Sequence, residues 1–173
     1  MSKKYESYYG INVRVRYYLR VVASRPYRAN LVEEKELWII KKDKEPQGCR
    51  PIRMEVGVED CLQIEFRFDK DTYCLTDAIT GSIHFILARI HILHMDIEII
   101  RKEIVGSGDK ELIESEVVAK YEIMDGLPVK DEVIPVRMYL IPYDLSPSFK
   151  NVDKLFSLKV AVLMAIECST ISI

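Results

Sequence analysis

The chain has 173 residues, of which 49% are hydrophobic and 30% are charged, and its formal net charge at pH 7 is -2. These proportions are typical of a soluble globular protein with enough apolar side chains to bury a core. The nearly neutral charge excludes the strongly basic surface by which many proteins bind nucleic acid.

The predicted elements are β-strands, because apolar and polar residues alternate with a period of two. Between residues 11 and 21, apolar side chains share one face, and arginines lie on the other. This pattern predicts a long, half-buried antiparallel strand. A second strand is expected around Leu37 and Ile39. The segment 44–51 holds two prolines and a glycine, which predicts a linker.

Alternation resumes after the linker, and the strands expected there cover residues 52–58, 62–68, 81–87, 117–122, 133–141 and 156–162. Near Ala88 and Arg89 the alternation slips, which predicts a β-bulge within one long strand. Pro135 confines its strand to a sheet edge or a bulge. No segment has a sustained helical period. We therefore predict an all-β fold, a sandwich of two sheets.

Two bulky apolar residues, Ile123 and Met124, stand directly before an expected turn at Asp125 and Gly126. Turns face water and are usually polar, whereas complete burial would stabilise each apolar side chain by roughly 1.5–3 kcal/mol. Either this tip folds back on its own sheet, or it is an anchor for a partner protein. Glycine at position 126 permits a positive φ. The residues of this candidate binding site, including those expected to shape or rim it, are Ile123, Met124, Asp125, Gly126, Tyr121, Leu127 and Pro128.

The chain offers little that suggests catalysis. The three histidines are His84, His91 and His94, but on a strand His91 points away from the other two, and no fourth ligand has a suitable spacing. The acidic residues that stand close together are Glu55, Glu59, Asp60 and Glu65. Their alternation favours a solvated face, or buried partners for the arginines at positions 14, 16 and 20, over paired catalytic carboxylates. With no nucleophile elbow and no phosphate-binding glycine loop, we expect no enzyme activity, no metal site and no cofactor.

The compartment also follows from the sequence. The four cysteines are scattered without a C-x-x-C pair and the first ten residues are polar, so nothing indicates a disulfide framework or a secretory signal. The apolar segment 79–100 contains Arg89, Asp96 and the histidines, which would be costly inside a membrane. We therefore predict a cytosolic protein without a membrane span.

Three stretches of the chain resemble the vacuolar protein sorting 26 family, the arrestin-like subunit of retromer. They are YESYYGINVRVRYYLRV at 5–21, MEVGVEDCLQIEF at 54–66 and AKYEIMDGLPVKDEVIPVR at 119–137. A weaker fourth is RIHILHMDIEIIRKEIVGSG at 89–108. The resemblance extends from about residue 5 to about residue 160. It implies an arrestin-like fold of two β-sandwich lobes joined by a short linker.

The resemblance also implies a division of the chain. Residues 1–43 are similar to the terminal strands of the N-terminal arrestin-like lobe, and residues 44–51 to the linker. Residues 52–173 are similar to the C-terminal β-sandwich lobe without its closing strand. A sandwich without that strand would leave one side of its core and a row of backbone groups uncovered.

The function that the resemblance implies is binding. The loop with Ile123 and Met124 matches the loop by which the family docks onto the helical-solenoid retromer subunit, vacuolar protein sorting 35. We therefore expect a non-catalytic scaffold or adaptor for endosome-to-Golgi and recycling transport of membrane cargo. It would be cytoplasmic and held peripherally on endosomes through its partners.

The family also binds cargo tails together with a sorting nexin, and Val56 matches one wall of that pocket. An aromatic wall of the family's pocket has no counterpart in this sequence, so we expect an incomplete cargo site. Two alternatives stay open: a stand-alone arrestin-like cargo adaptor, and a non-functional truncated fragment of the retromer subunit.

Overall fold

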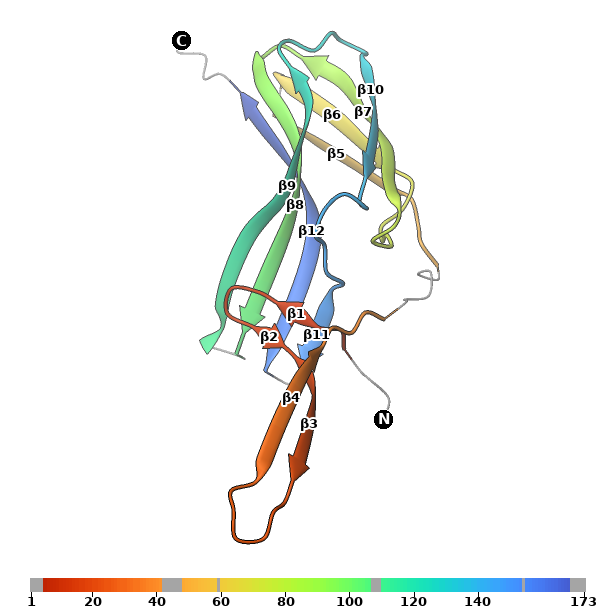
Figure 1. Ribbon diagram of the computed structural model, residues 1–173. Helices are drawn as coiled ribbons and strands as arrows, with labels where there is room; N and C mark the ends of the chain where they lie inside the picture. Colours follow the sequence, from red (N-terminus) through yellow and green to blue (C-terminus); the bar gives the residue numbers. More distant parts are fainter. Residues whose placement is uncertain (1–4, 42–47, 59, 107–109, 154, 169–173) are drawn as a thin grey trace. The chain divides into compact units, whose positions relative to one another are not determined.

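The computed structural model describes residues 5–41, 48–58, 60–106, 110–153 and 155–168 (Figure 1). These residues form twelve β-strands and no α-helix. Within the same ranges, no helix has the length and hydrophobicity that a membrane crossing requires.

The strands assemble into four sheets. Their bounds are β1 Tyr8–Tyr9, β2 Arg14–Val15, β3 Tyr17–Ala23, β4 Leu31–Leu37, β5 Ile52–Val58, β6 Leu62–Phe68, β7 Ala78–Ala88, β8 Ile92–Val105, β9 Leu112–Asp125, β10 Val133–Tyr139, β11 Phe149–Val152 and β12 Phe156–Cys168. Two sheets are four-stranded, with the orders β10-β7-β6-β5 and β11-β12-β8-β9, and the other two are the pairs β1-β2 and β3-β4. Among the described residues, one compact unit draws on 5–41, 103–114 and 149–158, and the other on 48–102, 115–148 and 159–168.

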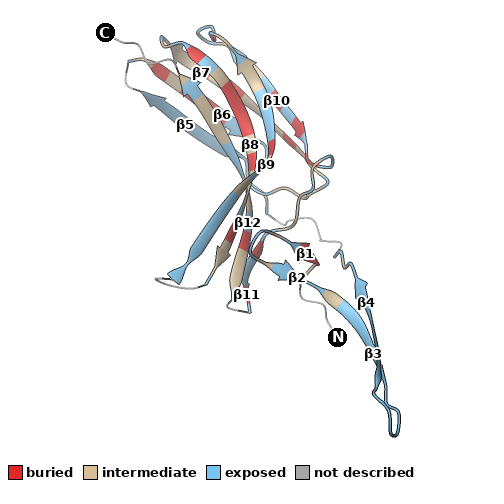
Figure 2. Cartoon of the chain, turned by 60° about the vertical axis from the view of Figure 1, so that its left-hand side comes forward, coloured by how far each residue is buried: buried red, intermediate tan, exposed pale blue. Residues whose placement is uncertain are grey.

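The larger unit is a β-sandwich whose core lies between the two four-stranded sheets. In β6, Ile64 and Phe66 are buried in this core, while Gln63 and Arg67 lie on the opposite face of the strand. Side chains from β7 and β10 join the core from the same sheet, and side chains from β8 and β9 join it from the other. Figure 2 shows buried positions on these strands, whereas β5 is exposed. The predicted all-β sandwich is confirmed.

The predicted β-bulge lies inside β7, between Phe85 and Leu87, but the single long strand expected around it is wrong, because the chain changes sheets after Ala88. β7 pairs with β6 in one sheet, and β8 lies in the opposite sheet. When a chain passes from one sheet of a sandwich to the other, its inward-facing side changes, which produces the same slip in alternation as a bulge. A register shift does occur inside β7, opposite Gln63 and Ile64 of β6. The prediction for Pro135 is confirmed, because β10 lies at the edge of its sheet.

The smaller unit departs from the predicted long, half-buried strand over 11–21. That segment is divided between β2 and β3, and β3 is exposed along almost its whole length. Its hydrogen-bonded neighbour is β4, so the described residues supply no second sheet to cover it. Arg20 pairs across the hairpin with Glu34 at 3.2 Å. Arg16 lies 4.0 Å from Glu36 of the same neighbouring strand, so both arginines have acidic partners in β4.

A buried carboxylate organises the turn between β1 and β2. Glu103 accepts hydrogen bonds from the backbone N–H groups of Ile11 at 2.9 Å and Asn12 at 2.8 Å, and from the Tyr8 hydroxyl. Tyr8 also belongs to a small apolar cluster with residues of β11 and β12. This unit thus has a core of its own, of which β3 and β4 are not part.

Candidate partner-binding site

The candidate site lies where the chain leaves β9 and crosses to the opposite sheet. β9 belongs to the sheet of β8 and β12, whereas β10 belongs to the sheet of β5, β6 and β7. The turn at Asp125 and Gly126 is therefore not the tip of a hairpin, as the sequence suggested, but the start of a crossing loop, residues 126–132 (Figure 1). Gly126 has the predicted positive φ, at 109°. Its N–H donates to the Leu93 carbonyl at 3.3 Å, which holds the loop against the beginning of β8.

Ile123 and Met124 are half-buried, and both pack against the core of the sandwich. Adjacent residues of a regular strand point to opposite faces. Here both reach the core, because the chain is leaving its sheet at this point. The protein's own core thus buries part of each side chain. The rest of each side chain is exposed and could be buried by a partner.

The most exposed apolar side chains are on the crossing loop itself. Leu127 is 61% exposed and Val129 is 69% exposed, and Tyr121 at the end of β9 is also exposed. Pro128, between the two loop residues, is buried and shapes the loop instead of presenting a surface. The sequence interpretation did not include Val129. A signal was available in the sequence, because residues two apart share one face of an extended chain, and Val129 is two residues after Leu127.

The far end of the crossing loop is fixed by hydrogen bonds. The Glu132 N–H donates to the Val129 carbonyl at 3.0 Å, and the Val129 N–H donates to the Glu132 carboxylate at 2.8 Å. The Asp131 N–H donates to the Phe85 carbonyl at 2.7 Å, and the Phe85 N–H donates to the Glu132 carbonyl at 2.9 Å. A loop held in this way loses little conformational entropy on binding.

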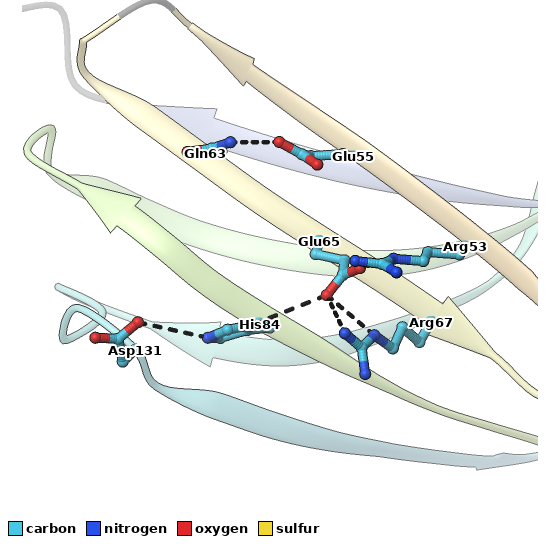
Figure 3. Close-up of polar contacts among 7 residues, drawn as sticks. All are labelled: Arg53, Glu55, Gln63, Glu65, Arg67, His84 and Asp131. Carbon is cyan, nitrogen blue, oxygen red and sulfur yellow. Dashed lines mark hydrogen bonds and ion pairs between the residues drawn. The ribbon is translucent and has the colours of Figure 1, made fainter.

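A cluster of charged residues lies on the outer face of the neighbouring sheet (Figure 3). Glu65 is only 2% exposed and accepts hydrogen bonds from Arg67, at 2.6 Å from Nη2, and from Arg53. The His84 ring lies between Glu65, at 3.9 Å, and Asp131 of the crossing loop, at 3.7 Å. The hydrogen bond from Arg67 is the largest of the contributions that lower the pKa of the Glu65 carboxyl.

This cluster corrects the expectation for the acidic residues. The buried carboxylate, Glu65, has Arg53 and Arg67 of its own sheet as partners, not the arginines at positions 14, 16 and 20. Glu55 stays on the surface and accepts a hydrogen bond from Gln63. Within the described ranges, no group of three or more His, Cys, Asp or Glu side chains is placed to hold a metal ion.

The outer face of β9 is also charged next to the site. Lys120 Nζ lies 2.8 Å from Asp96 Oδ2 and 3.7 Å from Glu98 Oε1 of β8. The hydrogen bond to Asp96 is the largest effect that raises the pKa of Lys120, so its ammonium group stays charged at neutral pH. One face of β9 therefore carries an ion pair with β8, and residues of the other face pack against the core.

Comparison with known proteins identifies the family. Residues 1–167 match the family model of vacuolar protein sorting-associated protein 26. The chain belongs to this family. It is 46% identical over 166 residues to vacuolar protein sorting-associated protein 26 of Dictyostelium discoideum and 48% identical over 159 residues to that of Caenorhabditis elegans. It is 47% identical over 155 residues to protein 26B of Arabidopsis thaliana.

The chain spans about half the length of these relatives. The three alignments cover 96%, 92% and 90% of this chain, but 48%, 44% and 51% of the relatives. Among solved structures, the chain is similar to the sporulation control protein Spo0M of Bacillus subtilis, with 15% identity, a TM-score of 0.46 and coverage of 63% of this chain and 44% of the other.

Val56, which the resemblance leads us to expect at a cargo pocket, lies in β5 at the edge of the sheet opposite β10. Val56 is half exposed and is paired with Ile64 of β6. Its side chain therefore lies on the core side of the sheet without being covered. Val56 lines an open pocket together with Val58, Leu62 and Leu87.

Proposed function

We propose that the chain is a non-catalytic scaffold or adaptor subunit of retromer. It docks by the crossing loop and the end of β9 onto the helical-solenoid subunit, vacuolar protein sorting 35, and serves endosome-to-Golgi and recycling transport of membrane cargo. It is cytoplasmic and peripheral on endosomes through its partners. The observation that carries the proposal is the display of Leu127 and Val129 on a loop with both ends hydrogen-bonded.

The chemistry of the loop suits a partner made of stacked helices. A helical solenoid presents grooves between its helices, and apolar anchors that fill such grooves supply most of the binding free energy. Ile123 and Met124 keep an exposed part beside the loop, and Asp125 and Gly126 set the direction in which the loop leaves β9. Tyr121 forms the rim. Because the loop is already ordered in the free protein, binding costs little conformational entropy and most of the binding free energy is retained.

The proposal includes the division of the chain that the family resemblance implies. In this scheme residues 52–173 are the C-terminal arrestin-like lobe that carries the docking loop, residues 44–51 are the linker, and residues 1–43 are the terminal strands of the N-terminal lobe.

A second candidate function is favoured by the open position of Val56. A stand-alone arrestin-like adaptor would accept an extended cargo tail along β5, with a sorting nexin as co-receptor, by adding a strand to the sheet edge. Such an adaptor would bind cargo tails but not the solenoid subunit. A truncated fragment without function would bind neither.

The deciding experiment compares two changes at apolar residues of similar exposure. The double variant Leu127→Asp with Val129→Asp places two carboxylates in the proposed interface, where they would be buried without partners. The matched control is Ile141→Asp, because Ile141 is 67% exposed but lies outside the loop. Binding to the purified solenoid subunit is measured by calorimetry. We expect a loss of roughly a hundredfold or more for the double variant and none for the control. Binding of the double variant at wild-type affinity would contradict the docking site.

A further inference from the structure

The strand β5 leaves one edge of its sheet open. In the order β10-β7-β6-β5 it has a neighbour on one side, β6, and the described residues place no strand on the other side. Figure 2 shows β5 exposed along its length, in contrast to the alternately buried strands β6 and β7. Unpaired N–H and C=O groups along such an edge are ready to pair with another extended chain.

The face of β5 that continues the core is also uncovered. Ile52, Met54, Val56 and Val58 are between 39% and 59% exposed. In the sheet register these four residues stand opposite Phe68, Phe66, Ile64 and Leu62 of β6, of which the last three are buried. Residues directly opposite each other share a face, so the apolar side of β5 extends the core surface outward.

The other edge of the same sheet is protected, but β5 is not. β10 carries Pro135, which cannot donate to a further strand, and its inward residues Val136 and Met138 are buried. β5 has no proline, no inward-pointing charge and no register shift against β6 over its seven residues. Prolines, inward-pointing charges and bulges are the features by which edge strands usually avoid pairing with another chain, and β5 has none of them.

The sequence of β5 is complementary to itself in one antiparallel register. When two copies pair with Met54 opposite Met54, Arg53 stands opposite Glu55 twice, and Ile52 stands opposite Val56 twice. A register centred on Glu55 would oppose two carboxylates, and one centred on Arg53 would oppose two guanidinium groups. Like charges directly opposite are destabilising, and opposite charges are stabilising. One register therefore combines apolar contact on the core side with opposite charges on the outer side, where Arg53 also contacts Glu65 and Glu55 also contacts Gln63 of the same copy.

We propose that the free edge of β5 pairs antiparallel with β5 of a second copy of this chain, in the register centred on Met54. The pairing joins the two sheets of the copies into one continuous sheet and covers the apolar side of β5. The Arg53–Glu55 pairs between copies are exposed at the rim, so they select the register more than they add affinity. One strand pair is a small interface, and we therefore expect a dimer whose population depends on concentration.

The test uses charge changes at the centre of the register. The molar mass of the full chain is measured by sedimentation equilibrium over a wide range of concentration. We expect the wild type to form a dimer, and Met54→Lys or Met54→Glu alone to weaken it by about tenfold or more, because two like charges then face each other. An equimolar mixture of the two variants should restore dimers, since a lysine then faces a glutamate. The matched control is Val133→Lys at the opposite edge strand, which should leave the dimer unchanged.

A second measurement needs no substitution. Amide hydrogen exchange in β5 should slow as the concentration of wild type rises, whereas exchange in β10 should not change. The proposal is overturned by a wild type that stays monomeric, by a dimer that Met54→Lys leaves intact, by a mixture that fails to associate, or by exchange in β5 that is independent of concentration. A monomer that instead binds an added cargo-tail peptide along β5 would assign this edge to a different occupant.

Discussion

Two strands of equal length, β6 and β3, show how differently one alternating pattern can be used. Both have seven residues, with apolar side chains at every second position. Leu62 of β6 is 7% exposed, whereas Leu19 of β3 is 59% exposed. β6 has hydrogen-bonded neighbours on both sides and a second sheet across the core, and β3 has β4 as its neighbour within the described part of the chain. Alternation thus specifies a strand, while its neighbours determine whether a face is buried.

The largest effect on the free energy of unfolding is expected for a substitution in β6. Leu62→Ala should lower the free energy of unfolding by about 2–5 kcal/mol, because it removes buried methyl groups and leaves a cavity. Urea denaturation followed by far-ultraviolet circular dichroism would measure the change. A loss below about 1 kcal/mol would mean that the sandwich core is not packed at this position.

An intermediate effect is expected at the docking site, where burial is partial. Ile123→Asp with Met124→Asn should abolish binding to the solenoid subunit, because it replaces both apolar anchors by polar groups that a partner would bury. Because both side chains pack against the core, the double variant should also lower the free energy of unfolding by roughly 1–3 kcal/mol. Parallel binding and denaturation measurements separate the two effects. Lost binding without any lost stability would show that both side chains are free of the core.

The buried carboxylate of β6 gives a smaller effect that depends on pH. Arg67 and Arg53 lower the pKa of Glu65 below its ordinary value of 4.5. The stabilisation by the ionised carboxylate is therefore fully present above that value, and is lost as the pH falls through the lower pKa of the folded state. Glu65→Gln should be less stable than wild type at neutral pH, and the difference should shrink in acid. A difference that stays constant from neutral to acidic pH would show that the ion pairs with the arginines do not stabilise the fold.

Much of the fold could be predicted from the sequence, because strand alternation, Pro135 and Gly126 are local signals. The crossing between sheets could not be, because an apolar run followed by a turn and another apolar run is common to a hairpin and to a crossing. The partners of Glu65 and the partial cover of Ile123 depend on residues that are distant along the chain. Val129 could have been recognised as part of the candidate site, since it is apolar and stands two residues after Leu127, on the same face of an extended chain.

The smallest effect is expected at β3, where the same leucine-to-alanine change should be almost silent. Leu19 is exposed on a two-stranded sheet, so Leu19→Ala removes few contacts and should change the free energy of unfolding by no more than about 0.5 kcal/mol. Leu62→Ala is its matched control, because the chemical change is identical and the burial is opposite. A large loss at Leu19 would mean that the apolar face of β3 is covered in solution, by another molecule or by another part of the chain. Repeating the measurement at several protein concentrations distinguishes these cases, because cover by another copy would make the loss grow with concentration.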